Sequence, residues 1–231
     1  MKKIVLLTFI AMSFFVRSQT VFENVRECIL VSSFKTALVQ MDSCIAKNYH
    51  KDSALFYKGL VYLKINNLKL ANAQCALLIK SFPEFMEAHY LSGLILCSEK
   101  NYGKSITEFS MVVKKYPNHF RALYNRSIAY GLSENYKSAV EDLSACISIK
   151  PMYSQAYYSR AYWNEFLGDK TNALKDYETT INLDPKNFDA YMGLAYLYAK
   201  QHDNEKACDV INSAIRSGSQ IAEELKMNFC K

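Results

Sequence analysis

The fold of this chain is decided by residues 154–187, which read SQAYYSRAYWNEFLGDKTNALKDYETTINLDPKN. In the first half, residues 156–167 have a helical pattern of aromatic and small residues, and Gly168-Asp169 breaks it as a helix-ending glycine does. In the second half, residues 173–183 place apolar side chains close to the i, i+3, i+4, i+7 spacing of one buried helical face. Asp184-Pro185 ends this pattern, because the residue before a proline avoids the helical region. The segment therefore predicts two consecutive helices.

The same pattern returns every 34 residues along the chain. The prolines show the period directly, at Pro83, Pro117, Pro151 and Pro185. Three ladders of small residues keep the same step: Ala54, Ala88, Ala122, Ala156 and Ala190; Ala71, Ser105, Ala139, Ala173 and Ala207; and Gly59, Gly93, Ser127, Ala161 and Ala195. Small residues let two crossing helices approach closely, so the ladders predict stacked helix pairs. They frame five repeats, at 52–85, 86–119, 120–153, 154–187 and 188–221.

This pattern resembles the tetratricopeptide repeat family, whose repeats combine spaced aromatic and small residues with a later alanine and a terminal proline. The matching residues are Tyr157, Ala161, Ala173, Tyr177 and Pro185, and then Tyr191, Ala195, Tyr198 and Ala207. The resemblance implies an all-α fold, an α-solenoid of antiparallel helix pairs that forms a right-handed superhelix. A solenoid needs covered ends. We therefore expect a divergent first repeat or capping hairpin at 19–51 and a capping helix at 222–231.

Residues 1–18 have the pattern of a signal peptide. A basic start at Lys2 and Lys3 precedes an uncharged run from 4 to 16, and cleavage would leave Gln19 first. A membrane-spanning helix needs roughly 20 apolar residues, so this run is short for a span. The pattern predicts an exported protein, periplasmic or secreted, with no membrane span in the mature chain. The alternative is a leader that is retained as an anchor.

Composition narrows the class of protein further. Half of the 231 residues are hydrophobic, 22% are charged, and there are only 7 Gly and 4 Pro, which favours a globular helical protein. Residues 1–18 hold three of the 28 basic residues and none of the 22 acidic ones, so removing them lowers the net charge from +6 to +3. That balance does not indicate a nucleic-acid partner, which needs a clustered basic surface.

The resemblance also implies a binding groove, because in this family the first helix of each repeat lines the concave side of the superhelix. The residues expected to line it are Phe56, Tyr57, Leu60, Tyr90, Leu91, Leu94, Tyr124, Asn125, Ile128, Tyr158, Tyr162 and Tyr196. Such a surface suits a peptide with apolar anchors. The function expected is a non-enzymatic scaffold for protein–protein interaction that binds a peptide or protein segment of unknown identity. The alternatives are that these aromatics serve packing, and that the chain is a structural subunit of a cell-envelope assembly, packing through its edges and convex face.

Two arginines stand where the family usually has leucine. Arg126 and Arg160 each have an aspartate sixteen residues later, Asp142 and Asp176, on the partner helix. Position 194, one period on, is a leucine and lacks the charge. This covariation of charge favours an ion pair between the two helices of a repeat, of about 1 kcal/mol or less if it is partly exposed. The alternative is a cationic site for an acidic ligand.

Seven cysteines leave at least one thiol outside any set of disulfides. Cys208 and Cys230 lie equally far from the expected turn near Ser219, so a disulfide between them is geometrically allowed, and two further thiols are the alternative. Cys75 and Cys146 fall on interior helix positions and are expected to be buried.

No motif for catalysis accompanies these features. The cysteines lack the spacing of a zinc knuckle, the four histidines are scattered, and there is neither a phosphate-binding glycine loop nor a G-x-S-x-G turn. The sequence therefore predicts no enzyme, no metal and no cofactor.

Overall fold

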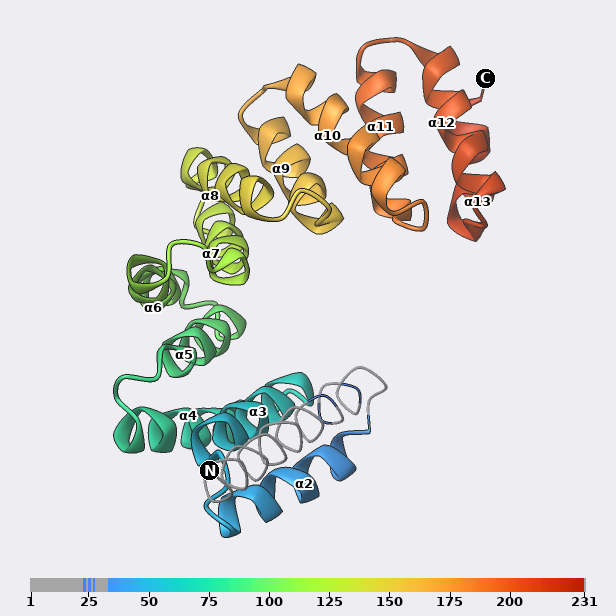
Figure 1. Ribbon diagram of the computed structural model, residues 1–231. Helices are drawn as coiled ribbons and strands as arrows, with labels where there is room; N and C mark the ends of the chain where they lie inside the picture. Colours follow the sequence, from blue (N-terminus) through green and yellow to red (C-terminus); the bar gives the residue numbers. More distant parts are fainter. Residues whose placement is uncertain (1–22, 24, 26, 28–32, 231) are drawn as a thin grey trace, which may run out of the picture. The chain divides into compact units, whose positions relative to one another are not determined.

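The structure is a computed structural model that describes residues 23, 25, 27 and 33–230. The expected signal peptide lies outside the described residues, and so do Cys28 and most of 19–32. Within the described part the chain is all α-helical (Figure 1). It divides into two compact units, one ending at Asn101 and the other beginning at Tyr102.

The first unit holds α2 to α5 and the second α6 to α13. The bounds in the first unit are α2 Phe34–Ala46, α3 Lys51–Lys64, α4 Leu68–Ser81 and α5 Met86–Ser98. Those in the second are α6 Tyr102–Lys115, α7 Phe120–Leu132, α8 Tyr136–Ile149, α9 Ser154–Phe166, α10 Lys170–Leu183, α11 Phe188–Lys200, α12 Asn204–Arg216 and α13 Gln220–Phe229. Each of the five 34-residue windows thus contains two helices, and the 86–119 window is shared between the units.

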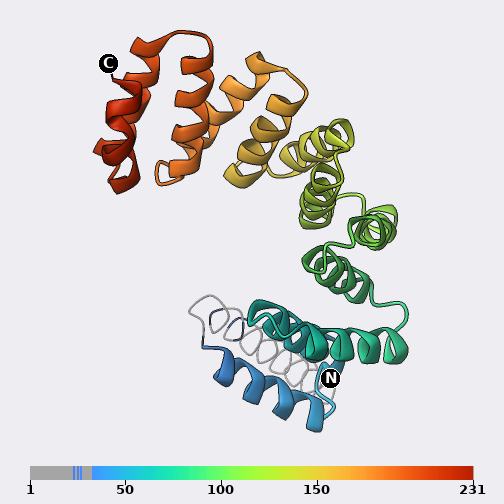
Figure 2. The same cartoon turned by 180° about the vertical axis from the view of Figure 1, so that it is seen from behind.

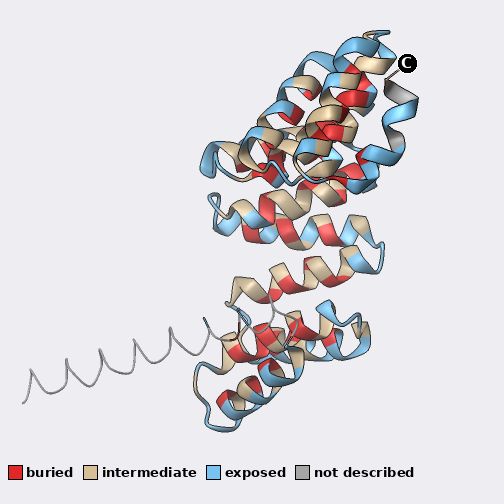
Figure 3. Cartoon of the chain, turned by 90° about the vertical axis from the view of Figure 1, so that its right-hand side faces the viewer, coloured by how far each residue is buried: buried red, intermediate tan, exposed pale blue. Residues whose placement is uncertain are grey.

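Within each unit every helix packs against the helix before it and the helix after it. The view from behind shows the same succession of short antiparallel helices (Figure 2). Together with the absence of strands in the described part, this is the architecture of an α-solenoid. Buried residues lie along the helix faces that meet neighbouring helices, whereas the connections are mostly exposed (Figure 3).

The small-residue ladders lie at the centre of this packing. All fifteen residues of the three ladders are buried. Their size is required: a Cβ built on Gly59 would come within 2.5 Å of Leu91 Cδ2, on the next odd-numbered helix. Side chains larger than these would hold the helices apart.

The turn inside each window has its own 34-residue period. A residue with positive φ follows the first helix of every window, at Asn66, Lys100, Glu134, Gly168 and His202. The next residue is an asparagine or an aspartate in each case, and four of these five cap the helix that follows: Asn67, Asn135, Asp169 and Asp203 accept from the backbone N–H three residues on. These turns fix the entry of each even-numbered helix.

The C-terminal helix begins earlier than the sequence predicted. It starts at Gln220 rather than 222, because Ser219 stands at the period position of the prolines and acts as an N-cap, accepting a hydrogen bond from the Ala222 backbone N–H at 3.2 Å. Gly218, with φ of 96°, follows the end of α12 just before this cap. The fifth window, 188–221, therefore includes the first two residues of α13.

Candidate protein-binding face

Four of the residues predicted to line the groove form a run of apolar side chains on α3 and α5 of the first unit. These helices contact each other. Phe56 and Leu60 lie one turn apart on α3, and Tyr90 and Leu94 occupy the same positions on α5. The ring centroids of Phe56 and Tyr90 are 6.4 Å apart, so the two helices present adjoining aromatic rings. All four side chains are partly exposed.

Two of the predicted groove residues are wrong. Leu91 is fully buried, and Tyr57 is 9% exposed; both belong to the core clusters. The physical reason is the helical step of about 100° per residue. A side chain one residue after Phe56 or Tyr90 points into the space between the helices of the repeat, where it fills the core rather than lining a surface.

The second unit carries the rest of the predicted residues. Tyr124, Asn125 and Ile128 lie on α7, Tyr158 and Tyr162 on α9, and Tyr196 on α11; α7 and α9 contact each other. Tyr124 is held on both sides: its ring lies 5.2 Å from that of Tyr153, and its hydroxyl accepts from Ser159 Oγ at 3.4 Å.

Tyr158 and Asn125 are less available than the others. The Tyr158 ring packs 5.9 Å from the buried ring of Tyr177, and burial raises the pKa of the Tyr158 hydroxyl. Asn125 Nδ2 donates to the backbone oxygen of Arg121 at 2.7 Å. The Tyr158 ring thus serves the helix packing as well as the surface, whereas the Asn125 amide is bonded to its own helix.

Among the predicted groove residues, the most exposed aromatics are Tyr162 and Tyr196, at 40% and 49%. Two neighbours that were not among the predicted groove residues extend the surface by one turn: Phe166 and Leu132, at 52% and 47% exposed. Phe166 lies four residues after Tyr162, and their ring centroids are 5.2 Å apart. Leu132 holds the position of Phe166 one repeat earlier. The 34-residue alignment of large apolar residues at helix ends was the signal for both. We call Tyr124, Ile128, Leu132, Tyr162, Phe166 and Tyr196 the aromatic face.

The two arginines form the predicted ion pairs. Arg126 bonds both carboxylate oxygens of Asp142 at 2.7 Å, and Arg160 bonds those of Asp176 at 2.7 and 2.8 Å. These hydrogen bonds raise the pKa of each guanidinium above its usual range. Only 5% of the Asp176 side chain is exposed, so this pair is more buried than the sequence pattern indicated.

Each arginine also makes a bond that the sequence pattern did not predict. The Nη1 atoms of Arg126 and Arg160 donate at 3.0 Å to Ser110 Oγ and Ser144 Oγ, sixteen residues earlier on the preceding even-numbered helix. One guanidinium therefore ties two successive even-numbered helices across the odd-numbered helix between them. The recurrence of serine sixteen residues before each arginine was the available signal.

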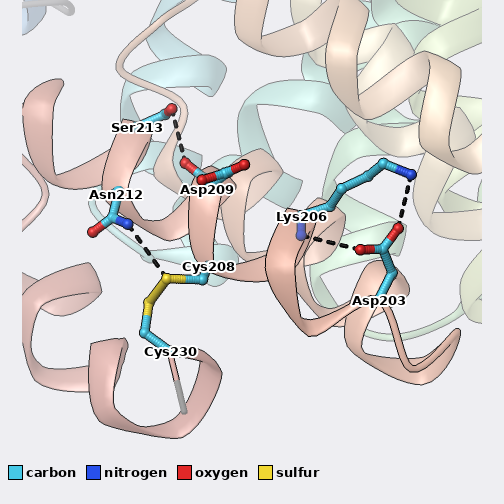
Figure 4. The surroundings of a disulfide bond; sticks show 7 residues. All are labelled: Asp203, Lys206, Cys208, Asp209, Asn212, Ser213 and Cys230. Atoms are coloured by element: carbon cyan, nitrogen blue, oxygen red, sulfur yellow. Dashed lines mark hydrogen bonds and ion pairs between the residues drawn. A yellow bond between two sulfur atoms is a disulfide. The ribbon is translucent and has the colours of Figure 1, made fainter.

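The disulfide that the spacing allowed is present. Cys208 on α12 is bonded to Cys230, with a Cα–Cα distance of 4.8 Å (Figure 4). Asn212 Nδ2 donates to Cys208 Sγ at 3.4 Å, one turn along α12. The bond ties the end of the chain to the last repeat.

Comparison with known proteins agrees with this architecture. A family model described as tetratricopeptide repeat matches residues 120–152, and another described as TPR repeat matches residues 167–201. The chain therefore contains tetratricopeptide repeats. Proteins of this family are in general non-enzymatic scaffolds for protein–protein interaction. No curated protein matches the sequence.

Solved structures share the tetratricopeptide fold at low sequence identity. The protein pilF from Pseudomonas aeruginosa is 17% identical, with a TM-score of 0.67 over 73% of this chain and 77% of that one. YrrB, described as a TPR protein with an unusual peptide-binding site, is 17% identical, with a TM-score of 0.63 over 81% and 97%. A tetratricopeptide repeat protein from Parabacteroides merdae is 14% identical, with a TM-score of 0.59 over 92% and 98%.

The described residues of this tetratricopeptide protein include neither a cluster of metal ligands nor a membrane-spanning helix. No three or more His, Cys, Asp or Glu side chains there gather as a metal ion would require. No helix in that part has the length and apolar character needed to cross a bilayer. Cys75 and Cys146 are buried as predicted, and burial raises the pKa of Cys146 to about 11. A thiol with so high a pKa stays protonated at neutral pH and is a poor nucleophile.

Proposed function

We propose that this tetratricopeptide repeat protein binds a peptide or protein segment on the aromatic face. The observation that carries the proposal is the exposure of Tyr162, Phe166 and Tyr196, each between 40% and 52%, on the same side of successive odd-numbered helices. Large exposed aromatics are the residues that dominate binding energy at protein interfaces. A preformed helical surface also lowers the entropy lost on binding. The peptide-binding site described for YrrB supports this use of the fold.

We also propose that the protein is exported to the periplasm or secreted. The leader pattern of residues 1–18 supports this, and so does the Cys208–Cys230 disulfide, because disulfides persist mainly in oxidising compartments. Mass spectrometry of the protein isolated from its own cells tests the cleavage: the expected N-terminal residue is Gln19. Recovery of a reduced, full-length chain from the cytoplasm would contradict the proposal.

The binding proposal is tested by capture from the cell envelope with three forms of the protein. The wild type and the variant Tyr162→Ala/Tyr196→Ala are compared with a control, Tyr116→Ala/Met152→Ala, which removes apolar side chains that are 44% and 75% exposed from the connections between helices. We expect the aromatic-face variant to lose its partner by about tenfold or more, since interface aromatics each contribute about 2 kcal/mol when they are hot spots. The control keeps its partner.

The structural alternative gives a different result in the same experiment. If the chain packs into an envelope assembly through its edges and convex face, all three forms recover the same proteins in the same amounts. Circular dichroism establishes that each variant retains its helices. Equal recovery by folded variants would overturn binding on the aromatic face.

A further inference from the structure

A cavity of about 380 Å³ lies on the second unit, between α10, α11 and α12. Its lining residues are Glu178, Ile181, Asn182, Tyr191, Leu194, Asp209, Val210 and Ser213. On α11, Tyr196 of the aromatic face lies two residues after Leu194, which is about 200° around the helix. The cavity and the aromatic face therefore open on different sides of this helix, and the cavity is independent of the proposed function.

The repeat explains why the cavity exists. One period earlier, Arg160 bonds Ser144 Oγ and the Asp176 carboxylate, and its guanidinium lies 5.7 Å from the centroid of the Tyr157 ring. Adding 34 to Ser144, Tyr157, Arg160 and Asp176 gives four lining residues of the cavity: Glu178, Tyr191, Leu194 and Val210. The cavity thus lies where the preceding repeat holds an arginine network, and Leu194, which is 4% exposed, stands at the arginine's position.

The substitutions leave this place acidic. Glu178 stands where the preceding repeat has a serine, and Asp209 adds a second carboxylate on α12, whereas the lining holds no Lys or Arg. Glu178 accepts from the Tyr198 hydroxyl at 3.2 Å, and no ion pair joins a described basic residue to Glu178 or Asp209. Figure 4 shows Asp209 and Ser213 one turn apart on α12. The nearby Lys206 is engaged with Asp203 at 2.7 Å.

Aromatic support for a cation is also present. Tyr191 holds the position of Tyr157, the ring beside which the Arg160 guanidinium lies. The Tyr191 hydroxyl lies 3.1 Å from Ser217 Oγ, which fixes the ring in its buried place. Arg126 and Arg160 each lie among a carboxylate on one helix, a serine hydroxyl on another and a nearby aromatic ring. The cavity offers carboxylates on two helices and the Tyr191 ring, which a flat guanidinium fits better than a compact ammonium does.

We propose that this cavity, the arginine pocket, binds an arginine side chain of a protein partner. The partner's guanidinium lies in the cavity beside Leu194, the residue that stands at the position of Arg160. It donates to Glu178 and Asp209 and lies against Tyr191. The pocket supplies the acceptors from α10 and α12, so binding ties these two helices together as Arg160 ties α8 and α10.

The test measures binding of acetyl-arginine amide to the full chain by backbone amide NMR. We expect saturable shifts at Glu178, Leu194, Val210 and Ser213. Acetyl-citrulline amide, which has nearly the same shape without the charge, binds about tenfold or more weakly, because charged hydrogen bonds are worth at least that factor. Acetyl-lysine amide falls between them. Equal shifts with citrulline and arginine, or shifts that map elsewhere, would overturn the proposal.

Two variants make the test specific. Leu194→Arg/Val210→Asp rebuilds the network of the preceding repeat and fills the pocket, so it should abolish the shifts. Glu178→Gln/Asp209→Asn keeps the size of both side chains and removes their charge, so it should weaken binding about tenfold or more even if the first variant fails to fold. The control Glu223→Gln/Glu224→Gln makes the same charge change at exposed sites on α13 and should bind as the wild type does.

These measurements test binding in the arginine pocket independently of binding on the aromatic face. The variant Tyr162→Ala/Tyr196→Ala should bind acetyl-arginine amide normally even where it loses its envelope partner. Unchanged binding by a folded Glu178→Gln/Asp209→Asn variant would show that the two carboxylates do not hold the guanidinium, and so would contradict the proposal.

Discussion

At the scale of single residues, Gly131 shows how tightly the repeats pack. A Cβ at this position would lie 2.2 Å from Trp163 Cε2, inside the indole of the next odd-numbered helix. The indole is rigid and 7% exposed, and its ring packs against those of Tyr136 and Phe166, so it has little room to move. We expect Gly131→Ala to destabilise the protein by about 1–3 kcal/mol, as overpacking of cores does. Urea unfolding followed by circular dichroism measures this.

Gly103 is the matched control for this substitution. It lies in the first turn of α6, and a Cβ built on it meets nothing within 4 Å. Gly103→Ala should therefore leave stability unchanged or raise it by up to about 1 kcal/mol, since alanine favours helix more than glycine does. The same sign for the two alanine variants would contradict the steric account of Gly131.

At the scale of elements, the helix caps predict how stability depends on pH. The Asp203 carboxylate caps α12 and accepts hydrogen bonds from the backbone N–H and the side-chain ammonium of Lys206. These bonds, the side-chain bond first, lower the pKa of Asp203 below its usual value of 3.8. Because the pKa of Asp203 is lower in the folded chain than in the unfolded chain, its carboxylate stabilises the fold fully above the unfolded-state pKa. This stabilisation is lost as the pH falls through the folded-state pKa. The wild type should be more stable than Asp203→Asn at about pH 6, and the gap should close as the pH falls through the lowered pKa of Asp203.

The reverse substitution checks the cap argument. Asn135 caps α8 through its side-chain oxygen without titrating. Asn135→Asp should therefore add a pH dependence of the same sign to a helix that lacked it. Thermal unfolding midpoints of the three proteins across this pH range provide the measurement. A gap between wild type and Asp203→Asn that does not change with pH would rule out the carboxylate as its source.

The disulfide makes a second prediction at the scale of elements. Cys208 and Cys230 are 22 residues apart, and a crosslink closing a loop of this length stabilises by about 3 kcal/mol in the chain-entropy model. Reduction, or Cys208→Ser/Cys230→Ser, should accelerate amide hydrogen exchange in α13 far more than in α9. Reductant added to the double variant should change nothing further. Unaltered exchange of α13 in the reduced wild type would show that packing alone holds this helix.

At the scale of the whole molecule, a substitution in a solenoid should destabilise mainly the helices next to it, because each helix contacts mainly those adjacent to it in sequence. Arg160→Ala leaves the Asp176 carboxylate buried without its cation, a change that costs about 3–5 kcal/mol at buried pairs. We expect amide exchange to accelerate in α8, α9 and α10 and to stay unchanged in α3 and α4. Equal acceleration in both units would mean that the chain unfolds as one cooperative block.

Local patterns in the sequence were enough to predict the fold. The proline period set the number of helix pairs, and the small-residue ladders identified the buried helix crossings, because both depend on residue type and spacing alone. The ion pairs of Arg126 and Arg160 were predicted for the same reason: the charges recur at a fixed separation. In contrast, Tyr57 and Leu91 were placed on the surface by analogy of position, and the helical step of about 100° turns them into the core.

An all-helical array of 34-residue repeats follows from the sequence alone, since periodic size and turn residues leave one way to bury the apolar faces. Which aromatics remain exposed follows from the packed fold, since exposure depends on side chains contributed by adjacent helices. It also joined Cys208 to Cys230, which the sequence only allowed. The arginine pocket likewise became visible only in three dimensions: Leu194 is an ordinary residue in the sequence, and it lines a cavity because α10, α11 and α12 meet around it.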